Sequence, residues 1–237
     1  MIEKCLISGK MTGRSFRNTT LTTNQSGDME TLERKAHWNH IYQEKTTDEV
    51  SWYQSVPVTS LDFVRQFNLP FNAKIIDIGG GDSFFVDHLL RLGYTDITVL
   101  DISAKAIEKA RQRLGADAGK VKWIEADAAC FQPMEKYDFW HDRAAFHFLT
   151  EEKEINNYLS CVQSNITPGG YLVIGTFSEQ GPDHCSGIEV EQYSEEKMSD
   201  RLKNFFRKIR CITVDHMTPS HSIQNFIFCS FSRLENI

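Results

Sequence analysis

The sequence predicts an α/β fold: a doubly wound, mainly parallel seven-stranded sheet that ends in an antiparallel hairpin. Between residues 74 and 177, short apolar runs alternate with amphipathic runs. This alternation is typical of a parallel sheet covered by helices. After residue 206, two more apolar runs are separated by a loop without a helical pattern, and strands joined in that way are normally antiparallel. The 237 residues, 41% of them hydrophobic, are enough to bury one sizeable core.

Seven apolar runs predict the strands of this sheet. The five parallel strands are expected at Lys74–Ile78, Ile97–Leu100, Val121–Ile124, Tyr137–Trp140 and Tyr171–Phe177. A Pro168-Gly169-Gly170 turn is expected before the fifth of them. The closing hairpin is expected to consist of Ile209–Val214 and Asn225–Phe231.

Small polar residues indicate where the helices begin, because their side chains accept hydrogen bonds from the first free N–H groups of a helix. The predicted caps are Thr59, Ser83, Ser103, Thr150 and Ser194. Gly93 suits the end of the helix that starts at Ser83, and the helix that starts at Ser194 is expected to run to Phe206. Further upstream, residues 32–42 suggest a helix that carries aromatic side chains.

The start of the chain differs in composition from the rest. Residues 15–28 are rich in Ser, Thr and Asn and contain only Phe16 and Leu21 as large apolar residues. Such a segment buries too little apolar surface to offset the entropy of ordering it. We expect residues 1–28 to be a disordered leader or tag, and residues 29–237 to form one domain. Within that domain, residues 29–70 are predicted to be cap helices and residues 71–237 the sheet core.

Composition and charge narrow the classes of partner. The net charge is −6 and the isoelectric point is about 5.8, which makes nucleic acid an unlikely main ligand. No apolar run is long enough to span a membrane. None of the six cysteines lies in a CxxC motif, so the spacing predicts reduced thiols in a cytoplasmic protein and no metal site.

A glycine-rich loop follows the first predicted strand, in the sequence Asp77-Ile78-Gly79-Gly80-Gly81-Asp82-Ser83. In an open parallel sheet, ligands bind beyond the carboxyl ends of the strands. A dinucleotide loop needs a third glycine where Phe84 stands, and a Walker loop needs a lysine that is absent here. A carboxylate at Asp77 suits a cationic ligand such as S-adenosylmethionine. Asp101, which ends the second strand, is placed to accept both ribose hydroxyls of that ligand.

With these motifs in this order, residues 35–233 resemble the class I S-adenosylmethionine-dependent methyltransferases. Ser83 stands where that family usually has a further glycine. The resemblance implies S-adenosylmethionine as cofactor. It implies that Asp77, Gly79, Gly80 and Gly81 hold the amino-acid end of the cofactor, that Asp101 and Ile102 hold the ribose, and that Asp127 and Ala128, after the third strand, hold the adenine.

The fourth strand leads into Trp140-His141-Asp142-Arg143, where the resemblance places the donor methyl group. His141, Arg143 and His147 are the candidate catalytic residues, and His141 is also expected to contact the cofactor. A base is needed only if the acceptor arrives protonated. The alternative is that this segment only pins the loop. Candidate acceptor-binding residues are Trp38, Tyr42, Trp52, Tyr53 and His184, the aromatic ones because cap helices supply one wall of the acceptor pocket in this family.

The resemblance predicts transfer of a methyl group to an unidentified acceptor, which we expect to be a small molecule. The chain lacks the [DN]PP[YF] sequence of the adenine and amide-nitrogen methyltransferases. Two alternatives stay open. One is a protein lysine methyltransferase, because an acidic protein suits a basic substrate. The other is a non-catalytic subunit that binds S-adenosylmethionine, although such a protein would be expected to have lost some of these motifs.

Overall fold

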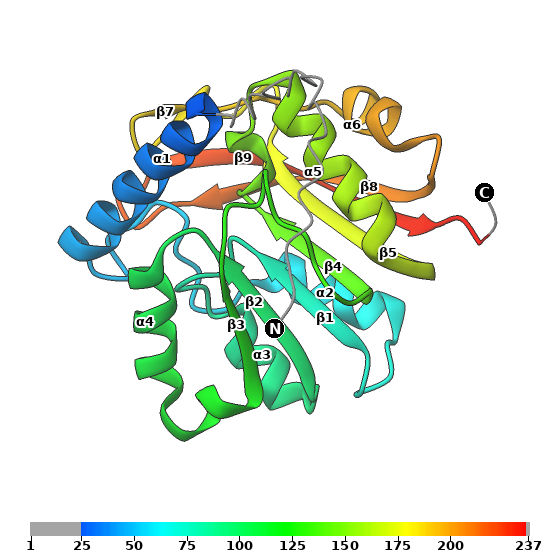
Figure 1. The fold of residues 1–237 in the computed structure, drawn as a ribbon, viewed down its shortest axis with the longest axis horizontal. Helices are drawn as coiled ribbons and strands as arrows, with labels where there is room; N and C mark the ends of the chain where they lie inside the picture. Colours follow the sequence, from blue (N-terminus) through cyan, green and yellow to red (C-terminus); the bar gives the residue numbers. More distant parts are fainter. Residues whose placement is uncertain (1–24, 236–237) are drawn as a thin grey trace, which may run out of the picture.

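A seven-stranded sheet lies at the centre of the computed structural model, which describes residues 25–235 (Figure 1). In spatial order, its strands are β3 (Val121–Glu125), β2 (Asp96–Asp101), β1 (Lys74–Ile78), β4 (Tyr137–Arg143), β5 (Ile166–Phe177), β9 (Ile223–Arg233) and β8 (Phe206–Met217). Strands β1 to β5 run parallel, whereas β9 runs antiparallel to β5 and to β8. The predicted doubly wound sheet and its closing hairpin are confirmed.

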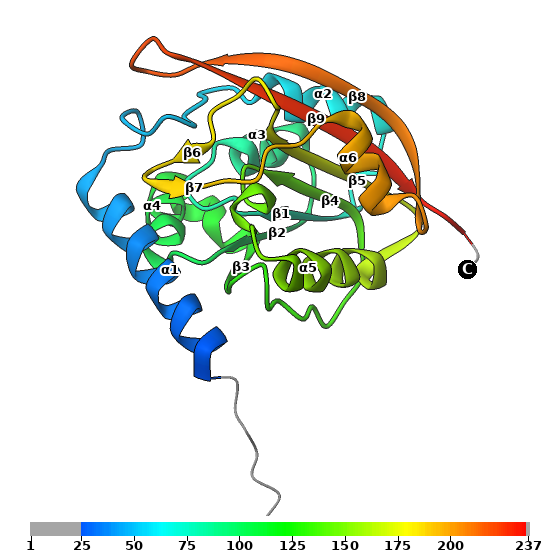
Figure 2. The same cartoon turned by 90° about the horizontal axis from the view of Figure 1, so that it is seen from above.

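Helices cover both faces of this sheet (Figure 2). They are α1 (Gln25–Glu44), α2 (Val58–Phe67), α3 (Phe85–Leu92), α4 (Ala104–Leu114), α5 (Glu152–Asn165) and α6 (Glu195–Leu202). Two short 3-10 helices, Gly115–Lys120 and Phe146–Phe148, and a small ladder of β6 (His184–Cys185) with β7 (Ile188–Glu189) complete the described chain.

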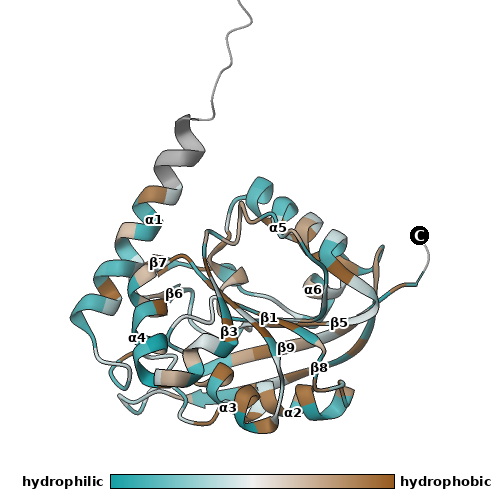
Figure 3. Cartoon of the chain, turned by 60° about the horizontal axis from the view of Figure 1, so that its bottom comes forward, coloured by the Kyte–Doolittle hydropathy of each residue, from teal (hydrophilic) through white to brown (hydrophobic). Residues whose placement is uncertain are grey.

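The alternation of side chains along the central strands creates two hydrophobic cores. Ile75 and Phe139 point to the face covered by α2 and α3, whereas Ile76 and Trp140 point to the face covered by α5 and α6. Burial of both faces explains why these strands read as continuous apolar runs. In Figure 3, hydrophobic residues follow the central strands, while the outer turns of the helices are hydrophilic.

The predicted helix caps are only partly correct. Ser103 and Ser194 cap α4 and α6 through their side chains, as expected. Thr59 and Thr150 are wrong, because α2 and α5 begin after Pro57 and Glu151 and neither has a side-chain cap. The remaining helix boundaries also move. Helix α3 starts at Phe85, α6 ends at Leu202, and the expected glycine turn at residues 168–170 lies inside β5 as an irregularity in register.

The prediction that the cysteines are reduced thiols is wrong for two of them, which lie in the β8–β9 hairpin. Cys211 and Cys229 face each other across β8 and β9 and form a disulfide, so they are not reduced thiols. The pairing depends on strand register, which a count of cysteines does not reveal. Cys130, Cys161 and Cys185 are free.

The beginning of α1 falls within the segment predicted to be a leader. Residues 25–28 are helical, and residues 1–24 lie outside the described part of the chain. Within residues 25–235, no helix is both long enough and apolar enough to cross a membrane.

Candidate functional site

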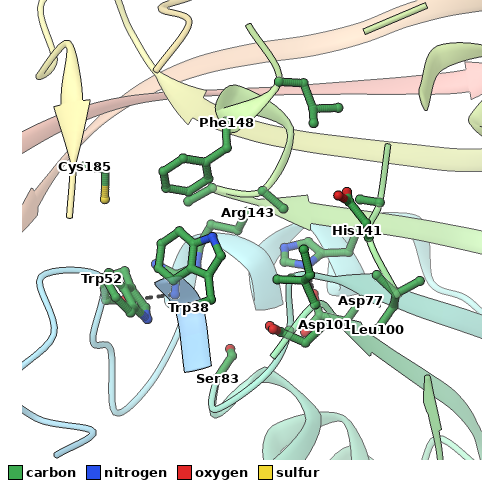
Figure 4. Close-up of a pocket in the computed structure, with 18 of the residues that line it drawn as sticks. Trp38, Trp52, Asp77, Ser83, Leu100, Asp101, His141, Arg143, Phe148 and Cys185 are labelled. Atoms are coloured by element: carbon green, nitrogen blue, oxygen red, sulfur yellow. Dashed lines mark hydrogen bonds and ion pairs between the residues drawn. The ribbon is translucent and has the colours of Figure 1, made fainter. Parts of the chain in front are cut away.

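A pocket opens at the carboxyl ends of β1, β2 and β4, where the strand order predicts a ligand (Figure 4). One half is formed by the loops that follow β1, β2 and β3, and we call it the donor half. The other half is formed by α1, the segment after α1, and the ends of β4, β5 and β9, and we call it the acceptor half. Both halves belong to the same pocket.

The glycine loop lies directly on two carboxylates of the donor half. A Cβ atom at residue 80 would overlap a carboxylate oxygen of Asp77, and a Cβ atom at residue 81 would overlap one of Asp101. Gly79 has a φ of +65°, a left-handed conformation that favours glycine. The loop therefore needs glycines to let the chain pass over Asp77 and Asp101. Gly79 and Gly80 line the pocket, whereas Gly81 lies behind its wall.

Arg113 of α4 fixes the far side of this loop, a contact that the sequence does not reveal. Its guanidinium forms ion pairs with Asp82 and Asp87 and donates to the carbonyl oxygen of Ser83 at 2.8 Å. It also lies over the ring of Phe84, 4.2 Å from the ring centroid. Asp82 is thus engaged by the protein, which leaves Asp77 and Asp101 as the carboxylates that face the ligand.

Asp77 and His141 form a buried pair at the adjoining ends of β1 and β4. Both are 2% exposed, and His141 Nδ1 lies 2.6 Å from Asp77 Oδ1. The second ring nitrogen of His141 lies 2.8 Å from Ser60 Oγ. The other oxygen of Asp77, Oδ2, is buried and has no hydrogen-bond partner within the described residues. An unpaired buried carboxylate oxygen beside a pocket fits the ammonium group of S-adenosylmethionine.

Asp101 is nearly buried where β2 ends. Its Oδ1 accepts a hydrogen bond from the backbone N–H of Ser103 at 2.7 Å. Burial, with a further contribution from the nearby charge of Asp77, raises the pKa of Asp101 to about 7. A ligand whose hydroxyl groups donate to this carboxylate would favour its charged form, so the position fits a ribose. Ile102 lines the pocket beside it.

Asp127 and Ala128 line the far end of the donor half. The Asp127 carboxylate accepts from Arg34 of α1 at 3.0 Å and from the backbone N–H of Ala129 at 2.9 Å. Arg34 also contacts Glu154 of α5 at 2.7 Å. The helix α1 is therefore tied to the edge of the donor half by an arginine that the sequence analysis missed. No motif surrounds Arg34, and Asp127 and Glu154 lie more than 90 residues away from it in the sequence.

Aromatic side chains form the acceptor half. Trp38 of α1 makes edge contacts with Trp52 and Phe148, at centroid distances of 5.7 and 5.0 Å. Tyr42 lies 6.0 Å from Trp52. Trp38, Tyr42 and Trp52 line the pocket, as the sequence predicts, although their contact with an acceptor stays a prediction.

Arg143 reaches the same half of the pocket from the end of β4. Its Nη2 donates to the carbonyl oxygen of Trp52 at 3.0 Å, and burial lowers the pKa of the guanidinium. The sequence analysis placed Arg143 beyond the strand, but β4 continues through it. Four further residues of this wall were missed, because β5, β9 and β6 carry no motif that marks them: Phe177, Phe226, Gln224 and Cys185.

Besides Gly81, three predicted site residues do not line the pocket. Tyr53 packs edge-on against Phe84, 6.0 Å between ring centroids. His184 is exposed on β6 and bonds the adjacent Asp183. His147 is fully buried, and its Nδ1 accepts from the backbone N–H of Phe177. Burial lowers the pKa of His147 to about 3, so its ring is neutral at pH 7.

The sheet order, the glycine loop and the paired carboxylates define a nucleotide-binding α/β protein of the Rossmann-like class. A family model described as "Methyltransferase domain" matches residues 75–170. Residues 75–170 thus match a methyltransferase domain, and the predicted resemblance to the class I S-adenosylmethionine-dependent methyltransferases is confirmed.

Known proteins resemble the chain over its sheet core. Malonyl-acyl-carrier-protein O-methyltransferase 2 of Ilyobacter polytropus is 28% identical over 148 residues, which cover 62% of this chain and 55% of that protein. Trans-aconitate 2-methyltransferase of Rhizobium leguminosarum is 28% identical, covering 62% and 56%. The chain thus spans about half the length of these relatives.

A solved structure extends the likeness in fold to most of the chain. It is that of 1,6-didemethyltoxoflavin-N1-methyltransferase from Burkholderia thailandensis, with 1,6-didemethyltoxoflavin and S-adenosylhomocysteine bound. The TM-score is 0.67 at 15% identity, over 92% of this chain and 93% of that one.

Proposed function

We propose that this protein transfers the methyl group of S-adenosylmethionine to a small-molecule acceptor. One observation carries the proposal: a single pocket joins a donor half with two buried carboxylates, Asp77 and Asp101, to an aromatic acceptor half. The names of the relatives also support it, because they refer to a malonyl carrier and to trans-aconitate.

In this proposal, the residues of the donor half bind and orient S-adenosylmethionine, which supplies the activated methyl group. Asp77 holds the ammonium group, Asp101 and Ile102 hold the ribose, and Asp127 and Ala128 hold the adenine. The acceptor half brings the nucleophile into line with the methyl group and excludes water. Alignment of this kind accounts for much of the rate in a reaction whose donor is already activated.

His141 is assigned a positioning role in this proposal. Both of its ring nitrogens already have partners, Asp77 and Ser60, at 2.6 and 2.8 Å. A general base needs a free ring nitrogen within reach of the acceptor. The geometry supports a structural role over a general base, and in this proposal His141 holds Asp77 toward the cofactor.

The test is a binding measurement followed by a transfer assay. S-adenosylhomocysteine should bind the full chain at about micromolar strength by calorimetry, a level common for cofactors and substrates. The protein is then incubated with radiolabelled donor and a cell extract, and small molecules are separated from proteins. Label in the small-molecule fraction supports the proposal. Binding of NAD instead of S-adenosylhomocysteine would refute it, and binding without any transfer would indicate a non-catalytic subunit.

Transfer to protein lysine is the second candidate. The observation in its favour is the aromatic group of Trp38, Tyr42, Trp52 and Phe148, because aromatic faces attract cationic side chains. Label in the protein fraction that withstands alkali would support it. The acidic charge of the chain keeps nucleic acid an unfavoured partner.

A cytoplasmic location also stays a prediction. The free thiols of Cys130, Cys161 and Cys185 agree with it, whereas the Cys211–Cys229 bond does not, since disulfides are rare in that compartment. Blocking of free thiols in intact cells, followed by mass spectrometry, will decide whether Cys211 and Cys229 are joined there.

A further inference from the structure

Arg143 brings a positive charge into the acceptor half without an acidic partner. Among residues 25–235, no carboxylate lies within ion-pair distance of its guanidinium. Its hydrogen bond to the carbonyl oxygen of Trp52 uses one of the five N–H donors of an arginine side chain. Figure 4 shows Arg143 between β4 and the aromatic rings of Trp38 and Phe148.

The unbalanced charge of Arg143 costs free energy in this pocket unless a ligand supplies a charge of opposite sign. The apolar rings of Trp38, Trp52 and Phe148 line the same pocket as Arg143, and burial already lowers the pKa of its guanidinium. A buried charge is normally balanced by a charge of opposite sign. The nearest compensating field comes from Asp77, which the donor's ammonium group would engage in the proposed function. With the donor's ammonium group on Asp77, Arg143 needs a further anion, and an acidic acceptor can supply it.

The pocket also lacks a base that could deprotonate an acceptor. Both ring nitrogens of His141 are engaged, and His147 lies outside the pocket. Asp101 is placed for the ribose on the donor side. An acceptor atom that arrives without a proton needs no such base. A carboxylate meets this requirement, because its ordinary pKa of about 4 leaves it ionised at pH 7.

We propose that the acceptor is a flat, unsaturated or aromatic carboxylic acid, whose carboxylate is bound by Arg143 and is itself methylated. The inference rests on the proposed function and names its substrate class. One carboxylate oxygen forms the new O–CH₃ bond, the C–S bond of the sulfonium donor breaks, and its electron pair goes to sulfur. The products are a methyl ester and S-adenosylhomocysteine, and no proton is transferred. The flat shape follows from the aromatic wall, which stacks on planar groups.

Binding of matched acid and amide probes tests the role of Arg143. Protein saturated with S-adenosylhomocysteine is titrated with benzoate, cinnamate and trans-aconitate, and with the corresponding amides. At least one acid should bind about tenfold or more tightly than its amide, because a charge-assisted bond is lost in the amide. Arg143→Met should abolish this preference, and Arg143→Lys should retain part of it. Equal binding of every acid and its amide would overturn the proposal.

The methionine carboxylate of the donor is the other source of an anion for Arg143. S-adenosylhomocysteine and its decarboxylated analogue are therefore compared on the wild type and on Arg143→Met. We expect both to bind each protein within about threefold of the wild-type affinity. If Arg143→Met weakens only the carboxylated form, by about tenfold or more, Arg143 holds the donor and the proposal fails. Equal melting temperatures of the variants would show that the fold is retained.

The product provides an independent readout. A methyl ester releases volatile labelled methanol in dilute alkali, whereas methyl groups on nitrogen or sulfur stay bound. After incubation with labelled donor and the best-binding acid or a cell extract, the label should be released by alkali. Alkali-stable label would refute the carboxylate acceptor but leave methyl transfer intact. Failure to bind S-adenosylhomocysteine would instead refute the proposed function itself.

Discussion

Burial of a single carboxylate, Asp101, links the donor site to pH. Because folding raises its pKa from 3.8 to about 7, the folded chain retains a proton that the unfolded chain has released. The contribution of Asp101 to folding stability therefore falls as pH rises from about 4 to about 7. It does not change further above that range. Ribose hydroxyls donate to the charged form, so we expect S-adenosylhomocysteine affinity to rise roughly tenfold between pH 6 and pH 8. Calorimetry at both values measures this, and Asp101→Asn should flatten the profile.

Removal of the Asp101 side chain should weaken the donor site directly. We expect Asp101→Ala to lower S-adenosylhomocysteine affinity by about 2 kcal/mol, because two charge-assisted hydrogen bonds are lost. Asp96→Ala is the matched control, since Asp96 opens the same strand and pairs with Lys122 far from the pocket. Equal losses in the two variants would place Asp101 outside the ribose site.

Substitution of His141 distinguishes a positioning role from a role in proton transfer. His141→Ala leaves Asp77 Oδ1 and Ser60 Oγ without their partners, at a cost of about 1–3 kcal/mol for each buried group. Affinity for S-adenosylhomocysteine and kcat/KM should therefore fall together, by about tenfold or more. Ser60→Ala, which removes only the second contact, should have a smaller effect. A hundredfold loss of turnover with unchanged affinity would instead identify His141 as a base.

At the scale of elements, α1 depends on Arg34 for its position over the donor half. Arg34→Gln would leave two partly buried carboxylates, Asp127 and Glu154, without their cation. We expect faster amide hydrogen exchange along α1, equivalent to about 1–3 kcal/mol of lost local stability. The control is Lys35→Gln, because the ion pair of Lys35 with Glu125 is about 40% exposed and contributes little. Equal exchange in the wild type and Arg34→Gln would contradict this role.

Local patterns predicted the strands more reliably than the helix ends. The sheet, the glycine loop and Asp101 depend on short runs of residues, whose periodicity and composition are visible in the sequence. Arg34, Arg113 and Gln224 join the site only through contacts with distant segments. The Cys211–Cys229 pair is intermediate between residues that a local pattern reveals and residues that only distant contacts bring together. The two predicted hairpin strands differ in length by one residue, so aligning them at the loop or at the open end shifts the partner of Cys211 between Phe228 and Cys229, and only the observed register fixes the pair.

At the scale of the whole molecule, the polar start of the chain should be separable from the domain. Deletion of residues 1–24 should leave the melting temperature within about 2 °C and the S-adenosylhomocysteine affinity unchanged, because the polar composition of most of this segment favours no packed core. Deletion of residues 1–44 also removes α1 with Arg34, which holds Asp127 at the edge of the donor half, so it should abolish donor binding. Thermal unfolding and calorimetry on both shortened chains measure the difference. A large loss of stability in the first deletion would show that this segment packs on the domain.

The alternating faces of β4 also affect how such an enzyme can diversify. His141 and Arg143 point to one face, toward Asp77 and the acceptor half. Asp142 points to the other, where Tyr158 and two backbone N–H groups hold it. Loss or gain of one residue in this strand would reverse all three side chains at once. Substitution at position 143 alone would change the charge offered to the acceptor and leave the donor site and the loop in place. The charge in the acceptor half can therefore be varied by substitution at position 143, whereas an insertion or deletion in β4 would also disturb the contacts of Asp77 and of the following loop.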